Sequence, residues 1–343
     1  MSGRQDRYLR QSGLSRIGDS GQNALASASV AVVGVGALGC AEAELLTRAG
    51  VGKIFLLDRD IVEWSNLQRQ CLFSESDAEL ALSKAHAAAH RLRQINSQIE
   101  LIPQAIDLHA GNIQDHLNGI TVVMDGSDNF AVRYLLNDWC VRESIPLIYA
   151  GAVDTYGMTG AVLPGEACLR CTWLTPPQPG EAPTCRTAGV LGSTISLIAA
   201  TAVTEAIKLI VGDKDSIFPG YRYFDSWENE ARGVHSKIDP DCPCCQKRDF
   251  QYLKQAGSPV AQTLCGGGTV QLPSFSTSPL DLQAISKTLK AKVENLSLTP
   301  QLLRFESGDL EIFCFADGRT LVRGTEDLGR ARSIVARTLG LSA

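Results

Sequence analysis

A glycine-rich loop near the start of the chain has the residue types and spacing of a phosphate-binding site. Gly34, Gly36 and Gly39 follow the apolar run Val30–Val33 and precede a stretch with a helical pattern. In a strand–loop–helix unit of this kind, the backbone can approach phosphate oxygens, and the free N–H groups of the helix attract them. Asp58 ends the next apolar run, where a carboxylate can meet ribose hydroxyls. These features predict a nucleotide site and fit either ATP or NAD.

Charged residues further along favour a triphosphate. Asn66, Arg69 and Gln70 follow shortly after the acidic residue, and Lys84 begins the next predicted helix. A triphosphate requires such a basic pair, because Arg binds phosphate oxygens bidentately and Lys supplies a point charge. Asp128 falls at the predicted carboxyl end of a strand, where it could hold Mg²⁺ or cap the following helix.

Two Cys-x-x-Cys pairs predict a metal centre. They are formed by Cys168 with Cys171 and by Cys242 with Cys245. Each turn directs two thiolates at one point, so the two turns complete a tetrahedral Zn²⁺ site. Because four thiolates leave no position for water, the predicted role is structural. Cys244 lies inside the second pair and leaves its register open, although the spacing favours Cys242 and Cys245.

Cys185 is the candidate reactive thiol. It lies beside Arg186 in a loop rich in proline and glycine, just before a long apolar helix. A helix N-terminus and an adjacent guanidinium both favour a thiolate. The alternative is an inert loop cysteine. A Cys–His hydrolase has no support, since no histidine is near in sequence.

The elements that must position these residues alternate between strands and helices. We therefore predict an α/β fold: a Rossmann-like, mostly parallel sheet with flanking helices, an antiparallel extension carrying the zinc site, and a small C-terminal α+β appendage. The predicted domains are 1–250 for the nucleotide and zinc sites, 251–279 for a linker and 280–343 for the appendage. The predicted strands of the first domain are Val30–Val33, Lys53–Leu57, Ile99–Ile102, Thr121–Met124, Leu147–Tyr149, Met158–Leu163 and Tyr221–Phe224. Its predicted helices are Leu38–Ala49, Ser83–Ile95, Asn129–Glu143 and the apolar run Gly189–Val211. In the linker we expect one strand, at Thr269–Leu272. In the appendage we expect a helix at Leu282–Val293, a hairpin of Leu310–Phe315 and Thr320–Val322, and a last helix capped by Thr325.

Composition excludes several classes of protein. The 343 residues carry a net charge of −5 and no basic cluster, which argues against nucleic-acid binding. The apolar run ending at Val211 contains Glu205 and Lys208, so we expect a buried helix rather than a membrane span. The polar start of the chain and the paired cysteines predict a cytoplasmic protein without a secretory signal.

Taken together, these motifs resemble the HesA/MoeB/ThiF family, whose members are related to the ubiquitin-activating enzymes. The resemblance covers about residues 4–250. The matching segments are Arg7-Tyr8-Leu9-Arg10-Gln11, the glycine loop, Asp58-x-Asp60, Ser65-Asn66-Leu67-Gln68-Arg69-Gln70, Lys84, Asp128-Asn129-Phe130 and both cysteine pairs.

The resemblance implies an ATP-dependent adenylyltransferase that activates the C-terminal glycine of a ubiquitin-like sulfur carrier ending in Gly-Gly and releases pyrophosphate. It implies a homodimer in which Arg10 reaches the ATP of the partner subunit, a structural zinc ion, and a conjugating or sulfur-handling role for Cys185. It also implies a separate sulfur-donor protein and a place in a sulfur-using pathway, which could be the biosynthesis of thiamine or molybdopterin, the thiolation of tRNA, or another pathway. The implied nucleotide site comprises Gly34, Gly36, Gly39, Asp58 for the ribose, Asp60, Asn66, Arg69, Gln70, Lys84, Asp128 for Mg²⁺, and Asn129.

Other functions remain open on sequence alone. A nicotinamide-dependent oxidoreductase accounts for the glycine loop and Asp58, but it leaves the basic pair and the cysteines without a purpose. A non-catalytic relative is opposed by the complete set of nucleotide residues. An enzyme that activates a ubiquitin-like protein for conjugation, or one that modifies a tRNA base or a peptide, would share the chemistry with another acceptor. We expect the appendage to help recognise the carrier or another partner.

Overall fold

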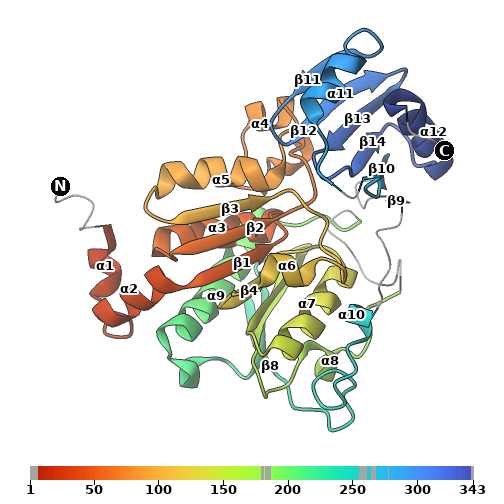
Figure 1. The fold of residues 1–343 in the computed structure, drawn as a ribbon. Helices are drawn as coiled ribbons and strands as arrows, with labels where there is room; N and C mark the ends of the chain where they lie inside the picture. Colours follow the sequence, from red (N-terminus) through yellow and green to blue (C-terminus); the bar gives the residue numbers. More distant parts are fainter. Residues whose placement is uncertain are drawn as a thin grey trace. The chain divides into compact units, whose positions relative to one another are not determined.

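The computed structural model describes residues 7–178, 181, 187–254, 261–263, 268–276 and 278–340. The chain divides into two compact units, Met1–Gln255 and Ala256–Ala343, each of which has its own sheet (Figure 1). Cys185 and Arg186 lie outside the described residues.

The first unit is built on an eight-stranded sheet in the order β3-β2-β1-β4-β5-β6-β7-β8. The first five strands in this order pair in parallel, and the remaining pairings from β5 to β8 are antiparallel. The predicted α/β class with an antiparallel extension is therefore confirmed. The strands are β1 (Ser29–Val33), β2 (Lys53–Leu57), β3 (Glu100–Gln104), β4 (Val122–Asp125), β5 (Leu147–Val153), β6 (Tyr156–Val162), β7 (Gly220–Asp225) and β8 (Glu230–His235).

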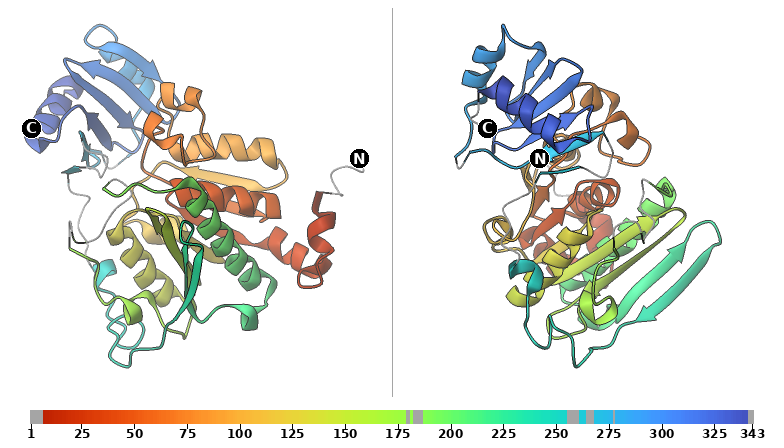
Figure 2. Two further views of the ribbon diagram at one scale, coloured as in Figure 1. Left: turned by 180° about the vertical axis from the view of Figure 1, so that it is seen from behind. Right: turned by 90° about the vertical axis from the view of Figure 1, so that its right-hand side faces the viewer.

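Alternation along the central strand separates two hydrophobic layers. Val30 and Val32 of β1 belong to one buried cluster, whereas Ala31 and Val33 belong to the other. Helices α3, α5 and α9 contribute to the first cluster, and α6 and α7 contribute to the second, so both faces of the sheet are covered (Figures 1 and 2). The unit's helices are α1 (Leu9–Ser12), α2 (Gly18–Ser27), α3 (Ala37–Ala49), η2 (Trp64–Asn66), α4 (Glu75–Glu79), α5 (Lys84–Ile95), α6 (Ile113–Leu117), α7 (Phe130–Glu143), α8 (Leu169–Thr172), α9 (Gly192–Val211), η3 (Lys214–Ser216) and α10 (Gln251–Lys254).

The strand order reverses direction between β1 and β4, which is where open α/β sheets have their ligand-binding crevice. The chain runs outward from β1 to β3 on one side and from β4 to β5 on the other, so the connections after these two strands diverge. Ligands of open α/β sheets bind at such a reversal, beside the carboxyl ends of the strands. The glycine loop follows β1, and the segment 126–129 follows β4.

Helix α9 is long and apolar enough to cross a membrane by length and composition. In the structure it packs on the sheet and on α3, with Ile198 and Ala202 fully buried. The buried Glu205 carboxylate accepts a hydrogen bond of 2.6 Å from Lys208. These contacts are those of a core helix, as predicted from the charged pair.

The second unit has a six-stranded sheet in the order β11-β12-β13-β14-β10-β9. Helices α11 (Leu282–Leu289) and α12 (Leu328–Leu339) pack with one face of that sheet in a separate core. This arrangement confirms the predicted α+β appendage. Its strands are β9 (Gln262–Thr263), β10 (Thr269–Leu272), β11 (Glu294–Leu298), β12 (Leu302–Ser307), β13 (Leu310–Phe315) and β14 (Thr320–Arg323). Strands β9 and β10 lie within the segment 251–279, which we predicted to be the linker.

The end of the chain corrects two details of the prediction. The last helix is capped by Asp327, whose carboxylate accepts hydrogen bonds from the N–H groups of Gly329 and Arg330. The predicted cap, Thr325, instead accepts from the N–H of Asp327. The preceding helix ends at Leu289, short of the predicted Val293, because the chain turns there into the unpredicted strand β11.

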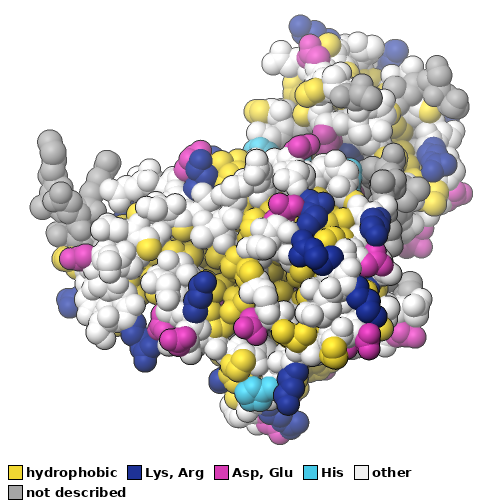
Figure 3. All heavy atoms as spheres, turned by 60° about the horizontal axis from the view of Figure 1, so that its bottom comes forward, with side chains coloured by type: hydrophobic (Ala, Val, Ile, Leu, Met, Phe, Trp, Pro, Cys, Tyr) yellow, Lys and Arg dark blue, Asp and Glu magenta, His cyan; other side chains and the backbone are white. Residues whose placement is uncertain are grey.

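Surface charges of both signs are interspersed on the face drawn in Figure 3, with apolar side chains between them.

Candidate active site and metal centre

The glycine loop is shaped by backbone contacts that exclude side chains. Gly34 has φ +86°, and a Cβ there would lie 2.8 Å from the carbonyl oxygen of Gly126. A Cβ on Gly39 would lie 1.8 Å from the carbonyl oxygen of Gly34. Gly36 is different, because its Cβ would meet only the Gly126 oxygen at 4.0 Å. The first and third glycines are thus required by the fold, and the middle one leaves open space where a phosphate can approach.

Asp58 holds this loop against the end of β2. Its Oδ2 accepts a 2.7 Å hydrogen bond from the N–H of Val35, and its Oδ1 accepts one of 2.7 Å from the N–H of Asp60. Burial raises the pKa of Asp58 to about 6, against the opposing charge of Lys84. A carboxylate has about four lone-pair sites, so both oxygens can still accept from ribose hydroxyls.

Lys84 lies in a cluster of carboxylates at the same edge of the sheet. Its Nζ is 3.4 Å from Oδ2 of Asp60, at the start of α5. Burial opposes the ammonium form, but Asp60, Asp58 and Asp128 together raise the pKa of Lys84 above its ordinary value. The lysine is therefore a permanent cation beside the glycine loop.

Arg59 is a functional candidate that sequence reasoning missed. Its guanidinium lies 3.2 Å from Oδ1 of Asp107 and 3.9 Å from Oδ1 of Asp60. Burial opposes its charge, yet Asp60, Asp107 and Asp128 raise the pKa of Arg59. The sequence offered one indication of this role, which is the position of Arg59 between Asp58 and Asp60. Its partner Asp107 comes close to Arg59 only in the tertiary fold.

The remaining candidates from the motif Ser65–Gln70 have different surroundings. Asn66 is buried and accepts a 3.0 Å hydrogen bond from the N–H of Glu63, which fixes the turn η2. Gln70 is also buried, and its Oε1 has no hydrogen-bond partner among the described residues. Arg69 donates to the backbone oxygen of Ser65 at 2.7 Å and forms no ion pair with a described carboxylate. Its guanidinium is therefore available for phosphate oxygens.

Asp128 and Asn129 differ in their relation to helix α7. The sequence left both Mg²⁺ binding and capping of this helix open for Asp128. The side chain of Asn129 caps α7 by accepting from the N–H of Ala131 at 2.8 Å. Asp128 does not cap the helix; its carboxylate is exposed at the end of the β4–α7 connection. The charge of Asp128 helps to raise the pKa values of Lys84 and Arg59, so its carboxylate lies near both cations.

Arg10 is not near the glycine loop of its own chain. It lies on α1, which is anchored at the opposite end of α3, where Gln11 donates to the carbonyl oxygen of Ala49 at 2.8 Å. The hydroxyl of Tyr8 accepts from Asn96 at 2.8 Å in the same region. Helix α3 alone separates the two ends by about 20 Å at 1.5 Å per residue.

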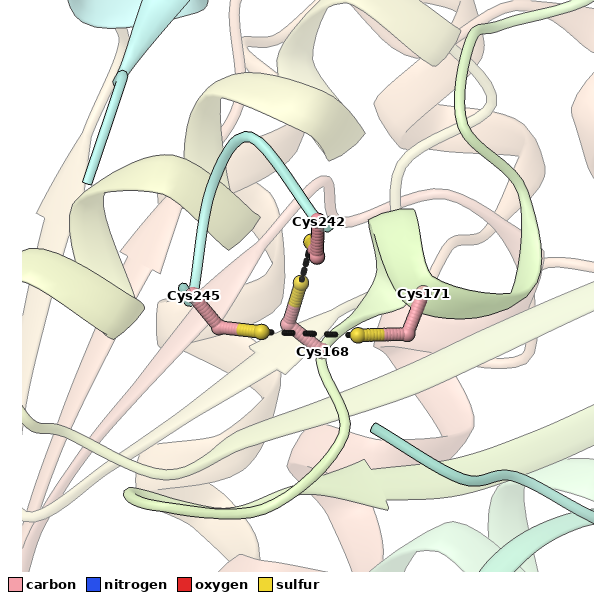
Figure 4. Close-up of side chains that lie close together, drawn as sticks. All are labelled: Cys168, Cys171, Cys242 and Cys245. Carbon is pink, nitrogen blue, oxygen red and sulfur yellow. Dashed lines mark hydrogen bonds between the residues drawn. The ribbon is translucent and has the colours of Figure 1, made fainter. Parts of the chain in front are cut away.

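The structure brings the four predicted metal ligands together (Figure 4). The sulfur atoms of Cys168, Cys171, Cys242 and Cys245 all lie within 4.8 Å of one another. Cys168 is 3.6 Å from Cys242, and Cys171 is 3.4 Å from Cys245. Tetrahedral Zn²⁺ with Zn–S bonds of about 2.3 Å separates its sulfurs by about 3.8 Å, so these residues fit a zinc ion.

Asn137 on α7 links the two cysteine turns. Its Oδ1 accepts from the N–H of Leu169 at 2.9 Å, and its Nδ2 donates to the sulfur of Cys244 at 3.3 Å. Asn137 and Cys244 are fully buried. Cys244 thus packs against α7, and its sulfur also interacts with that of Cys168. The four sulfurs that lie together are those of Cys168, Cys171, Cys242 and Cys245, which is the register that the spacing favours.

Comparison with known proteins shows which family the chain resembles. A model of the ThiF family matches residues 8–244. The chain is 40% identical over 338 residues to the sulfur carrier protein ThiS adenylyltransferase of Bacillus subtilis, covering 97% of this chain and 99% of that protein. It is 35% identical over 240 residues to the SAMP-activating enzyme E1 of Haloferax volcanii, covering 70% of this chain and 88% of that enzyme. The structure of E. coli MccB with ATP shares the fold, with a TM-score of 0.61 and 23% identity over 70% of this chain and 74% of that one.

Proposed function

The chain belongs to the ThiF family, and from this membership we propose that it is an ATP-dependent adenylyltransferase that activates the C-terminal glycine of a ubiquitin-like sulfur carrier. The observation that carries the proposal is the convergence of Lys84, Asp58 and Asp128 beside a glycine loop at the β1/β4 crevice. Alignment over both units with a ThiS adenylyltransferase makes a ThiS-like carrier the expected substrate.

The reaction joins two anions, which explains the residues gathered here. A carboxylate oxygen of the carrier attacks the α-phosphorus of ATP, the bond to the bridging oxygen breaks, and pyrophosphate leaves with that electron pair. The barrier falls when cations and N–H donors are fixed where negative charge accumulates. We assign the phosphates to the glycine loop, Asn66, Arg69, Gln70 and Lys84. Asp58 would bind the ribose.

The chemistry of the carboxylates fits a hard divalent cation. Asp60 and Asp128 would hold Mg²⁺, which when bound neutralises phosphate charge. Asn129 would support this position by holding the start of α7.

The cysteine cluster would hold zinc in a structural role. The two turns come from segments more than 70 residues apart, at Cys168–Cys171 and Cys242–Cys245. An ion bound by both would join these segments beneath α7. With four thiolates it has no open position, so it would stabilise the fold without entering the reaction.

A homodimer would complete the site with Arg10 of a second copy. Helix α9 runs from the nucleotide end, where Gly192 lies beside the carbonyl oxygen of Gln68, to the α1–α2 end, where Val211 contacts Gly21. Its outer face includes the exposed Leu197. A two-fold axis across this face would bring the partner's α1 to the nucleotide end. Exposed Leu9 and Leu14 beside Arg10 suit such a contact.

The steps after activation complete the proposal. Cys185 would act in transfer of the activated carrier or of sulfur, with sulfur from a separate donor protein, and the reaction would take place in the cytoplasm. The oxidoreductase alternative has no support from the comparisons, in which the named relatives are adenylyltransferases and an activating enzyme.

One experiment tests the core of the proposal. The protein is incubated with ATP, Mg²⁺ and each candidate carrier ending in Gly-Gly, and carrier mass is measured together with pyrophosphate. We expect a carrier–AMP adduct and stoichiometric pyrophosphate, and neither with a carrier lacking its last glycine or with NAD in place of ATP. Pyrophosphate release without a carrier adduct would contradict the assigned substrate, and no release with any carrier would contradict adenylation.

A further inference from the structure

The connection after β4 interlocks with the glycine loop through backbone alone. A Cβ on Gly126 would lie 2.6 Å from the carbonyl oxygen of Gly34 and 2.9 Å from the Cα of Gly39. A Cβ on Gly34 would in turn lie 2.8 Å from Gly126 and Ser127. No side chain fits between the two loops, so displacement of one must displace the other.

A buried arginine on α7 fixes this connection from behind. The Nε of Arg133 donates to Oδ2 of Asp125 at 2.7 Å. Its Nη2 donates to the carbonyl oxygens of Ser127 at 2.9 Å and Ala150 at 3.0 Å. The guanidinium therefore ties together the end of β4, the connection itself and the neighbouring strand β5.

Asp125 completes the same network from the other side. Its Oδ1 accepts from both the N–H and the Oγ of Ser127, at 3.1 and 2.6 Å. The next residue, Asp128, has an exposed carboxylate that accepts no hydrogen bond from the described residues. The contacts of Ser127 therefore fix the backbone from which the Asp128 side chain extends.

A lysine could not reproduce the contacts of Arg133. The planar guanidinium meets three acceptors at once and also stacks 4.7 Å from the ring centre of Tyr149. An ammonium is a point charge without this fork or this stacking surface. Burial opposes the charge, but Asp125 and Tyr149 raise the pKa of Arg133, so the cation persists at all relevant pH.

We propose that Arg133 is a positioning residue that sets the Asp128 carboxylate relative to the glycine loop, and thereby couples divalent-cation binding to nucleotide binding. The inference rests on the proposed function. It assigns no contact between Arg133 and the nucleotide. Replacing Arg133 should therefore reduce the gain in ATP affinity that Mg²⁺ produces. It should have much less effect on ATP affinity in the absence of metal.

The test measures ATP affinity of the full chain by calorimetry, once in EDTA and once in Mg²⁺. The ratio of the two dissociation constants reports the coupling. In Arg133→Lys we expect the ratio to fall by about tenfold or more, with the metal-free affinity within about threefold of wild type. In Asp128→Asn the ratio should fall in the same way, so this variant serves as the reference.

Arg170→Lys is the matched control. Arg170 lies on α8 and is also buried; it pairs with Asp138 of α7, the helix that carries Arg133, at 3.7 Å, and it stacks 5.4 Å from the ring of Tyr252. Its loss should lower thermal stability while leaving the ratio unchanged. If Arg133→Lys does not fold, Ser127→Ala, which removes one hydrogen bond to Asp125, should give a smaller fall in the ratio.

Two results would overturn the inference. One is a wild-type ratio in folded Arg133→Lys, or in Ser127→Ala if that variant replaces it. The other is an equal loss of affinity with and without metal, which would make Arg133 a general structural residue. Failure of the proposed function is seen separately, as absent ATP binding or absent pyrophosphate release in the wild type.

Discussion

Lys84 contacts Asp60 through both its backbone and its side chain. Its N–H donates to the Asp60 carbonyl oxygen at 3.0 Å, and its Nζ lies 3.4 Å from Oδ2. The start of α5 is thus fastened to the segment after β2. Because Asp58 and Asp128 also act on this ammonium, a nucleotide would enter a site whose positive charge is already held in place.

The first prediction concerns the two cations assigned to phosphate. Lys84→Ala and Arg69→Ala should each lower ATP–pyrophosphate exchange by at least about a hundredfold, because fixed charge stabilises the transition state. Circular dichroism should show an unchanged fold. Lys53→Ala is the control, since its ion pair with Glu100 is on the surface and should not affect exchange. Wild-type exchange in either site variant would remove that residue from the mechanism.

The second prediction concerns Glu42, a fully buried carboxyl one turn into α3. Neither oxygen has a hydrogen-bond partner among the described residues. Burial, with a smaller contribution from Asp125, raises the pKa of Glu42 from 4.5 to about 8. The folded state therefore keeps a proton that the unfolded chain releases, so this group lowers stability progressively as pH rises from 4.5 to 8.

Glu42→Gln removes that ionisation while keeping the shape of the side chain. The variant should match wild type near pH 4.5 and exceed it by up to about 4 kcal/mol at pH 8, measured by urea unfolding. Glu44→Gln, on the same helix but paired with Arg48 at the surface, should show no such growth with pH. A pH-independent difference for Glu42→Gln would show that the carboxyl is ionised in the folded protein.

The bounds of several strands could be predicted from the residue pattern within the strand itself. The bounds of β2, β10 and β13 match the prediction, because their apolar runs end at polar or turn residues. Strand β8 was missed because all six of its residues are exposed and leave no apolar pattern. Its identity depends on pairing with β7, which is a tertiary contact.

Some residues of the candidate site could likewise be predicted from the sequence, and others could not. Residues in short motifs, such as Lys84 and the paired cysteines, could be predicted from type and spacing. Arg59 and Arg133 could not, because their partners come from other parts of the fold: Asp107 lies in the loop after β3, and Ala150 lies on β5. The far position of Arg10 is also a property of the fold, since only packing places α1 at the end of α3 away from the glycine loop.

The third prediction concerns the cysteine cluster. Metal analysis of the wild type should give about one zinc per chain, and Cys168→Ser should lose the metal and melt at lower temperature. Cys244→Ser is the matched variant, because that sulfur contacts Asn137 and Cys168 but is not one of the cluster of four. It should keep the zinc. Loss of zinc in Cys244→Ser with retention in Cys245→Ser would reverse the assigned register.

The fourth prediction tests whether Arg10 acts across a dimer. Arg10→Ala and Lys84→Ala should each be inactive alone. After mixing under conditions that exchange subunits, half of the dimers are mixed and each has one intact site, so activity should return to about a quarter of wild type. Mixing two Lys84→Ala preparations is the control. No recovery, with subunit exchange shown independently, would place Arg10 outside the partner's site.

The last prediction separates the two units. The 240 residues aligned with the SAMP-activating enzyme make up 88% of it, so that enzyme is about 270 residues long (240/0.88) and has little room for a second unit. The first unit also has its own cores on both faces of the sheet. A chain ending at Lys254 should therefore fold and bind ATP with wild-type affinity.

The same truncated chain should lose affinity for its carrier, because the alignment with the ThiS adenylyltransferase covers 97% of this chain and so includes the second unit, whereas the alignment with the SAMP-activating enzyme covers only 70% of it. Carrier binding is measured by calorimetry with a non-hydrolysable ATP analogue, and an expected fall of about tenfold would correspond to about 1.4 kcal/mol. Point variants in the core of the second unit, such as Phe305→Ala, would produce the same loss if the folded unit is what the carrier requires. Unchanged carrier affinity in the truncated chain would show that the second unit has another role.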